Sequence, residues 1–583
     1  MDWRRWATSL SIARGGFAVT VVTACVTGFI GLREQLATQP GSRHDTLEVV
    51  YCVIQLFALS SDGVSQGGHL PWALQVARFV APAATAYAFF EAGRQLFAAE
   101  IRQRRVRRKR GHVIVCGDSL AAKVLTRTLV SAGGDVVALA DDPERGATRV
   151  SGDPRSTATF KVAGVSGAAA VYICGDDSAH NLAVALAAAN GAASDQLRIY
   201  AEMDDVELCH ALRARWWSGR GSQRVRLDFF NRDELAARAL AREEERALTA
   251  EDAYELIVVG TGGFARALVI ESARRRWPPI LPDGHRPGIT LVGEGADRIV
   301  GEMTGRFPFL RSACELRASQ DAPPVAARAA VGRAAHVRVY LCQDDPREAL
   351  RLALADTALW QTRPDSVVVC FDDLVGYGAA FDYGEETAMA LDGMDGRLRL
   401  WGTTNAAFSL GSMDEDLTEM IARSVHERYL ARRKAERAAG VEVTGTLSSW
   451  EDLPENLREA NRYQVRDFGA KLSAMGCTVV LRNDASAPFA FAAEEVEALA
   501  EHEHERWSAE RRAAGWSYGP VRDDDGRIHP DLVPWESLAE PDREKDREAV
   551  RGIALVLADA GFDVVRLRPP QSGTSESVVT AGM

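Results

Sequence analysis

The first hundred residues carry the longest apolar stretches of the chain. Ala13–Leu32 is apolar apart from one charge near its start, and Trp72–Phe97 is a second stretch whose charged residues gather towards its end. Each is long enough for a helix that crosses a bilayer. Leu47–Ser60, between them, is apolar but too short to span and is typical of a re-entrant segment. The pattern predicts two transmembrane helices with a re-entrant helix between them.

The distribution of basic residues predicts the orientation of these helices. The strongly basic block Arg102–Arg110 directly follows the second stretch, and Arg4 and Arg5 precede the first. Lys and Arg mark the cytoplasmic side of a membrane. A cleaved signal peptide is the alternative for the first stretch, but no small-residue cleavage pattern follows it. We therefore expect a multi-pass protein of the inner (plasma) membrane with its soluble domains in the cytoplasm.

After the basic block, short apolar strands alternate with amphipathic helices. His112–Cys116 leads into a turn that begins at Gly117 and has Ser119 where a dinucleotide-binding turn has its middle glycine. Small residues in this turn let backbone N–H groups and a helix N-terminus approach a pyrophosphate. The next strand, Asp135–Ala140, ends at Asp141, where an acid is expected to accept a ribose hydroxyl. The pattern predicts a doubly wound α/β lobe of Rossmann type that binds a nucleotide.

The continuation of this lobe supports a family resemblance. Gly152 and Asp153 form a GD pair, and the run GDDSAHN starts at Gly175. With the turn and the strand-end acid, this order resembles the RCK (TrkA-N-like) domain, the nucleotide-binding module of Trk-type potassium uptake systems and potassium-channel regulators. The resemblance covers Gly111 to about Glu245. It implies NAD(H) or an adenine nucleotide such as ATP as the ligand, with Asp153 among the binding residues.

The strand and turn pattern then appears a second time. Glu255–Val259 leads into a turn with Gly260 and Gly262, and Glu294 is the candidate acid after the following strand. Two copies predict tandem RCK-like lobes. For each lobe the alternative is a scaffold that binds nothing and serves only in assembly. The further strands predicted for the second copy are Ile289–Val292, Val337–Leu341, Ser366–Phe371 and Arg397–Trp401.

Near the C-terminus, large aromatic side chains lie among polar residues. Trp507, Trp516, Trp535 and Tyr518 fall within one short segment, and Arg522 follows in a turn. Indoles in polar surroundings are platforms for stacking a flat ligand, and a guanidinium can hold a phosphate through two hydrogen bonds. The alternative is that the tryptophans pack a small helical core.

This segment resembles the ryanodine-receptor (RyR) repeat, and Leu453–Val480 fits the start of the same module. The resemblance implies a mainly α-helical domain that binds adenine nucleotides or ADP-ribose-like signals, with His504 as a packing or ligand-contact residue. The residues that carry it are Leu499, Ala500, Glu501, His504, Trp507, Gly515, Trp516, Tyr518, Gly519, Pro520, Arg522, Asp523, His529, Pro530, Leu532, Leu538 and Lys545.

These segments predict an α-helical membrane anchor, two Rossmann-like lobes and a mainly α-helical RyR domain. A charged helix over 414–438 is expected to connect the second lobe to the RyR domain and to present a solvated face. The predicted divisions are a pore-like region 1–110, a first lobe 111–245, a second lobe 252–440, a linker 441–452, an RyR domain 453–567 and a disordered tail 568–583.

Composition narrows the chemistry. The net charge is −12 despite the basic block, so the soluble part is acidic and is not expected to bind nucleic acid. The nine cysteines show no CxxC or metal-ligand spacing, which predicts reduced buried thiols and no metal site. No acid-base pair or substrate domain accompanies either lobe. We therefore expect no enzymatic activity, against the alternative of an NAD-dependent redox enzyme.

Helix, short re-entrant helix and helix is the layout of a two-helix potassium-channel pore. The position of the selectivity filter reads Ala58, Leu59, Ser60, Ser61, Asp62, Gly63, which departs from a TVGYG-type loop of carbonyls. One hypothesis is a nucleotide-gated, potassium-channel-like protein or potassium transport regulator, formed as a homo-oligomer because two helices cannot enclose a pore. The other is a non-conducting, membrane-anchored nucleotide sensor or effector in bacterial stress or antiviral signalling.

Overall fold

The chain forms two compact units, Met1–Val106 and Arg107–Met583, which are described separately. The finer domain boundaries stay a prediction. The predicted tail beyond 568 and part of the predicted linker lie outside the described residues. The computed structural model describes residues 3–37, 46–58, 70–192, 197–217, 225–247, 254–275, 286–372, 397–409, 417–440, 447–483 and 489–568.

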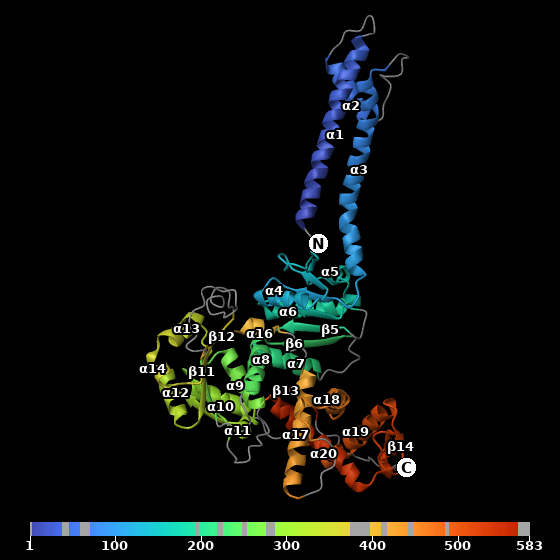
Figure 1. Ribbon diagram of the computed structural model, residues 1–583. Helices are drawn as coiled ribbons and strands as arrows, with labels where there is room; N and C mark the ends of the chain where they lie inside the picture. Colours follow the sequence, from blue (N-terminus) through green and yellow to red (C-terminus); the bar gives the residue numbers. More distant parts are fainter. Residues whose placement is uncertain are drawn as a thin grey trace, which may run out of the picture. The chain divides into compact units, whose positions relative to one another are not determined.

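The N-terminal unit consists of helices. The predicted segments lie in α1 (Trp3–Ala37), α2 (Thr46–Phe57) and α3 (Trp72–Arg107) (Figure 1). Small residues let α1 and α3 approach closely, because a Cβ atom at Gly31 would collide with the backbone of Leu74. Among the described residues, one helix, Trp72–Gly93, is long and apolar enough to cross a membrane, and α2 is a shorter apolar helix. The filter positions after Ala58 lie outside the described residues.

The first sheet of the second unit has Rossmann topology. Its order is β3-β2-β1-β4-β5-β6, and every neighbouring pair is parallel. The order reverses between β1 and β4, which is where such sheets bind ligands. The strands are β1 (Val113–Cys116), β2 (Val136–Leu139), β3 (Thr148–Arg149), β4 (Ala170–Ile173), β5 (Arg198–Glu202) and β6 (Arg226–Phe230), and the helices are α4 (Leu120–Ser131), α5 (Thr157–Val162), α6 (Ser178–Gly191), α7 (Val206–Trp217) and α8 (Arg232–Ala247).

The second sheet repeats this topology. Read from β9, its order β9-β8-β7-β10-β11-β12 matches that of the first sheet, again with parallel pairs. The prediction of two Rossmann-like lobes in tandem is therefore confirmed. The strands are β7 (Tyr254–Val259), β8 (Gly288–Val292), β9 (Glu315–Ser319), β10 (His336–Leu341), β11 (Ser366–Phe371) and β12 (Leu398–Gly402), and the helices are α9 (Gly263–Arg275), α10 (Ala296–Arg306), α11 (Leu310–Ala313), α12 (Pro323–Val331), α13 (Pro346–Ala355), α14 (Thr357–Gln361) and α16 (Thr403–Ala407).

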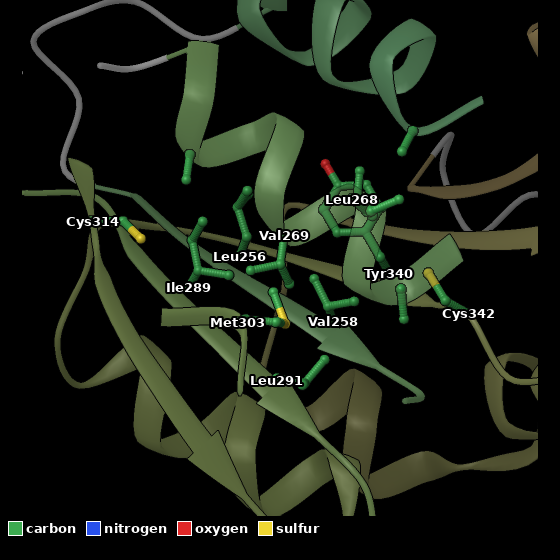
Figure 2. Close-up of a cluster of buried hydrophobic side chains, with 14 of the residues drawn as sticks. Leu256, Val258, Leu268, Val269, Ile289, Leu291, Met303, Cys314, Tyr340 and Cys342 are labelled. Atoms are coloured by element: carbon green, nitrogen blue, oxygen red, sulfur yellow. The ribbon is translucent and has the colours of Figure 1, made fainter. Parts of the chain in front are cut away.

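The central strands β7 and β8 of the second sheet are buried on both faces because helices cover both. Leu256 and Leu291 come from β7 and β8, and Val269 and Met303 come from α9 and α10, and all four belong to one buried cluster (Figure 2). Parallel sheets covered in this way show continuous apolar runs rather than alternation. This explains why the strands were predictable from the sequence.

The two lobes share part of their cores. α8 packs on α9, and α16, which follows β12 of the second lobe, packs on α8 and α4 of the first. Ala407 and Phe408 are fully buried there, and the Phe408 ring meets the Phe230 ring edge to face at a centroid distance of 6.0 Å. A segment late in the second lobe thus completes the core of the first.

The helix predicted as a solvated connector is instead part of a core. α17 (Leu417–Ala438) buries Ile421 and Ala422 and packs on α18 and α20, and its Arg428 donates to Asp559 at 2.6 Å. The charged residues that suggested a solvated face are in part ion-paired across this interface. The C-terminal module comprises α18 (Glu455–Ala474), β13 (Cys477–Leu481), α19 (Ala493–Ala513), β14 (Ser517–Tyr518), β15 (Ile528–His529), α20 (Glu540–Asp559) and β16 (Phe562–Arg566), with β13 and β16 paired antiparallel.

Candidate functional site

A cavity of about 440 Å³ opens at the carboxyl ends of β1, β2 and β4 in the first lobe. Gly117 makes the tight turn above it with φ +122°, and a Cβ atom there would collide with the carbonyl oxygen of Cys174. Only glycine adopts this backbone without strain. The turn therefore brings the start of α4 close to β4. The lining includes Gly117, Ser119, Asp141, Asp176, His180 and Asn181.

Ser119, which replaces the middle glycine, acts as a helix cap. Its hydroxyl donates to the Cys174 carbonyl at 2.8 Å and accepts from the Ala122 N–H at 3.2 Å. The hydroxyl is thus engaged by the protein. The other N–H groups in the first turn of a helix have no intrahelical partner and favour an anion. The substitution is compatible with a phosphate site formed by the backbone of α4.

The predicted strand-end acid lies in the cavity lining. Asp141 follows β2, its side chain is exposed, and its backbone N–H donates to Asp118 at 2.9 Å. Arg149 is 3.6 Å from the Asp141 carboxylate. Asp141 is therefore positioned as a strand-end acid that can accept hydroxyl groups of a ligand.

Asp153 lies in the turn between two residues of the cavity lining. Its carboxylate accepts from the backbone N–H of Arg155 at 2.9 Å and from the guanidinium of the same residue at 3.1 Å. Gly152 and Pro154 line the cavity, whereas Asp153 is not among the lining residues. The Asp153 carboxylate thus stabilises its own turn, and its role in cofactor binding stays a prediction.

Two buried polar residues at this edge of the sheet were not among the predicted site residues. Asn181, almost fully buried, donates to the carbonyl oxygens of Gly175 at 2.7 Å and Glu202 at 2.9 Å. Glu202, at the end of β5, is 5% exposed, and its burial raises its pKa to about 7, with Asp176 and Asp204 adding to the shift and Arg232 opposing it. The sequence did contain an indication for Asn181, because this residue ends the run GDDSAHN that starts at Gly175. Nothing in the sequence near Glu202 indicated burial of its side chain.

We expect Glu202→Gln to change how stability depends on pH. An unfolded glutamate has a pKa of about 4.3, and that of Glu202 in the fold is about 7. The neutral form is favoured by folding, so the stability it contributes is present at low pH and is lost as pH rises towards the folded pKa. The melting temperature of Glu202→Gln, relative to that of the wild type, should therefore rise between about pH 4 and pH 7, the interval between the unfolded and folded pKa values. Glu505→Gln, an exposed site, is the control; a parallel pH dependence of Glu202→Gln and wild type would contradict the assignment.

The second lobe builds the same turn in acidic surroundings. Gly260 also has φ +122°, and a Cβ atom there would collide with the Cys342 carbonyl. At Gly262, however, a Cβ atom would meet the carboxylate of Asp344. Burial and the charges of neighbouring acids raise the pKa of Asp233, which stands against the next glycine, to about 6. The negative charges of these carboxylates disfavour the binding of a pyrophosphate at this turn.

Glu294, the acid predicted for the second lobe, is exposed directly after β8. This is the position that Asp141 has after β2. In the described part of the second lobe there is therefore a strand-end acid, and the glycine turn faces carboxylates. The geometry at Gly260, Gly262 and Glu294 supports the alternative that the second lobe is a scaffold that binds no nucleotide.

In the C-terminal module, the structure brings two of the predicted aromatic residues together. The rings of Trp507 and Trp516 meet His529 edge on, at centroid distances of 5.0 Å and 6.1 Å. Arg511 lies over both indoles, at 5.9 Å and 5.2 Å. We refer to Trp507, Trp516, His529 and Arg511 as the tryptophan cluster. Its rings are already contacted by protein groups.

The other predicted ligand residues of this module are placed differently. Trp535 belongs to a buried apolar cluster, and His504 is 3% exposed and contacts the Val533 carbonyl at 2.8 Å. Both side chains pack in the interior of the module, which agrees with the alternative that the tryptophans form a small core. Tyr518 is 61% exposed, and Arg522 is exposed and donates to Asp524 at 2.8 Å.

Comparisons with known proteins identify two parts of the chain. Residues 113–216 match the family model of the TrkA-N domain, and residues 491–566 match that of the RyR domain. These matches confirm the two resemblances inferred from the sequence. Similar solved structures include GsuK bound to ADP (14% identity, 69% of this chain and 96% of that chain, TM-score 0.31) and the GsuK channel bound to NAD (12% identity, 62% and 81%, TM-score 0.26).

Proposed function

We propose that this chain is a nucleotide-gated membrane protein with a potassium-channel-like layout, or a potassium transport regulator, that works as a homo-oligomer. The observation that carries the proposal is the cavity of the first lobe. There the Gly117 turn, the start of α4 and Asp141 converge at the point where the strand order reverses. The segment that forms this cavity is the one that matches the TrkA-N domain.

The residues of the cavity suggest how a nucleotide binds. The backbone at the start of α4 holds phosphate, and Asp141 accepts ribose hydroxyls. The charged residues of the lining are Asp118, Asp141 and Asp176, with His180 as the only basic side chain among the lining residues. Carboxylates repel phosphates, so a diphosphate such as ADP or NAD(H) is favoured over ATP. The role is binding and not catalysis.

The N-terminal unit supports a place in the membrane. Its helices expose many large apolar side chains, among them Val22, Ile30, Ile54, Phe79 and Phe89. A soluble protein rarely leaves so many apolar groups in contact with water, whereas lipid or another subunit can cover them. We place the two spans in α1 and α3, α2 in the re-entrant position, and the second unit in the cytoplasm on the basis of the basic block.

Gating requires that the ligand bind more tightly to one of two arrangements. α3 ends at Arg107, and the chain enters β1 at Val113. β1 itself ends at the Gly117 turn of the cavity. The chain therefore connects the second predicted span to the nucleotide site through one short strand, which is the route we propose for coupling.

The test is ion flux and nucleotide binding with the full-length protein in liposomes. NADH, ADP, ATP and ADP-ribose are added in the presence of potassium and sodium gradients. Asp141→Ala should weaken binding about tenfold or more, because it removes charge-assisted hydrogen bonds, and should reduce nucleotide-dependent flux in parallel. Glu207→Ala, which removes a carboxylate of α7 that is 78% exposed and lies outside the lining, is the matched control. Equal binding by wild type and Asp141→Ala would contradict the proposed site.

The second candidate function is a non-conducting, membrane-anchored nucleotide sensor or effector. The observation that favours it is the filter position, where the residues from Ala58 to Gly63 do not form a TVGYG-type sequence. Nucleotide binding that depends on Asp141, without flux of either ion, would support the sensor over the channel.

A further inference from the structure

His210 lies where three parts of the second unit meet. It belongs to α7 of the first lobe and is 7% exposed. Its ring faces Glu234 of α8, Arg306 at the end of α10 in the second lobe, and Phe562 of β16 in the C-terminal module. We refer to His210, Glu234 and Arg306 as the histidine junction. These three residues do not line the nucleotide cavity of the first lobe.

The hydrogen bonds of His210 define which ring nitrogen carries the proton. The Arg306 guanidinium lies 2.6 Å from Nδ1 of His210, and a guanidinium can only donate. Nδ1 is therefore assigned as the acceptor, without a proton. Nε2 contacts the Glu234 carboxylate, which can only accept when it is ionised, so Nε2 carries the proton. In this arrangement His210 is neutral.

Glu234 is held in its ionised form by its neighbours. Burial opposes ionisation, but His210, Arg213 and Arg238 hold the pKa of Glu234 below its usual range. Arg213 donates to one carboxylate oxygen of Glu234 at 3.1 Å, and His210 contacts the other. Both oxygens are therefore engaged, and the carboxylate is an acceptor for the Nε2 proton of His210.

A second proton on the His210 ring is incompatible with this arrangement. Protonated Nδ1 is a donor and cannot accept from Arg306. Two cations would then face each other at a distance where a hydrogen bond had been, and like charges disfavour the charged form. Burial lowers the pKa of His210, Glu234 opposes this shift, and Arg306 and Arg213 add to it. The geometry and the charges therefore both favour neutral His210 in the closed junction.

The charged groups on the elements around the histidine junction already have partners within the described residues. Asp228 of β6 lies 3.6 Å from Arg213. Glu207 lies 3.6 Å from Arg306, but it is 78% exposed, so water weakens this interaction. A proton on Nδ1 therefore has to compete with existing pairs. The remaining charged groups are Asp205, which caps α7, Arg238, which faces Glu271, and the paired Arg482 and Asp563 of β13 and β16.

The C-terminal module is attached at the same place. Arg482 of β13 donates to the carbonyl oxygen of Gly305 at 3.2 Å, directly before Arg306 in the chain. The Phe562 ring of β16 meets the His210 ring edge on, at a centroid distance of 6.2 Å. A change in the hydrogen bond between Arg306 and His210 therefore acts on contacts of both lobes and of the module.

We propose that the histidine junction is a proton-sensitive contact, which joins the two lobes and the C-terminal module near neutral pH and loosens on acidification. The atom that takes the proton is Nδ1 of His210, and the contact that breaks is the hydrogen bond from Arg306. Folding favours the neutral ring, so its contribution to stability is present above the ordinary histidine pKa of about 6.5 and is lost as the pH falls below it. This inference goes beyond the proposed function, because it requires no nucleotide.

The test is hydrogen exchange of the full-length protein at about pH 7.5 and about pH 5.5, with labelling times scaled to the intrinsic exchange rate. Peptides that cover 206–217 and 296–306 should lose protection at the lower pH, by up to about tenfold, because an open-state histidine with a pKa of about 6.5 becomes protonated over this interval. His210→Gln should show equal protection at both pH values. His502→Gln, which removes a half-exposed histidine of α19, is the matched control and should keep the wild-type response.

Arg306→Met is a second test that does not depend on how well His210→Gln folds. Without the guanidinium, protonated His210 can pair with Glu234 and faces no cation from α10, so the loss of protection at the lower pH should largely disappear. Glu202 cannot cause the loss, because folding favours its protonated form. Unchanged protection of the wild type between the two pH values would overturn the proposal, as would a wild-type loss of protection that persists in His210→Gln or in Arg306→Met.

Discussion

Lys471→Met is expected to destabilise the C-terminal module by about 3 to 5 kcal/mol, the cost of removing one partner from a buried ion pair. Lys471 of α18 is 2% exposed, and its ammonium group pairs with Glu503 of α19 and, at 2.8 Å, with Asp467. Burial opposes ionisation of Glu503, but Arg506 and Lys471 hold its pKa below its usual range. Without Lys471, Glu503 keeps one cationic partner, Arg506, in a dry environment.

The measurement is hydrogen exchange of peptides from α18 and α19 in the full-length protein, which reports the local free energy of opening. Lys545→Met is the control, because Lys545 forms an exposed pair with Asp542 at 2.6 Å and such pairs contribute about 0 to 1 kcal/mol. Equal protection of α18 in the two variants would show that the buried pair does not hold the two helices together.

Gly117→Ala is expected to cost about 3 kcal/mol or more in the first lobe and to abolish nucleotide binding there. Two effects add: a backbone conformation that only glycine adopts freely and a steric collision that the packed sheet must relieve. The collision is with the carbonyl of Cys174, the residue that follows β4. Relief requires β1 and β4 to separate at the point where the cavity opens. Thermal unfolding and hydrogen exchange of β1 and β4 measure the loss.

Gly133→Ala provides the matched control for this change. Gly133 also has a positive φ of +82°, but a Cβ atom there meets nothing within 4 Å. It should cost only about 1 to 2 kcal/mol, the price of a left-handed alanine. If Gly133→Ala were as damaging as Gly117→Ala, the close approach to Cys174 would not be the cause. Gly260→Ala should reproduce the effect of Gly117→Ala in the second lobe, with Gly295→Ala as its control.

The sequence by itself determined the two Rossmann lobes and the positions of their turns. Buried parallel strands leave continuous apolar runs, and tight turns above them need glycine, so β1, β7, Gly117 and Gly260 were all readable. Asp141 was readable for the same reason, since it directly follows a strand whose end must reach the ligand edge of the sheet. The local sequence is enough to predict such strands and turns, because the geometry of the backbone requires these residue types there.

Contacts between distant segments were decided only by the tertiary structure. The run of charges in α17 looked solvated, yet Arg428 pairs with Asp559 across a packed interface. The indoles of Trp507 and Trp516 are covered by Arg511, and Trp535 lies in a small core. The sequence shows which side chains the chain contains. It does not show which residues, distant in the sequence, cover those side chains in the folded protein. The same limit hid the histidine junction, because its three residues come from segments that meet only in the folded unit.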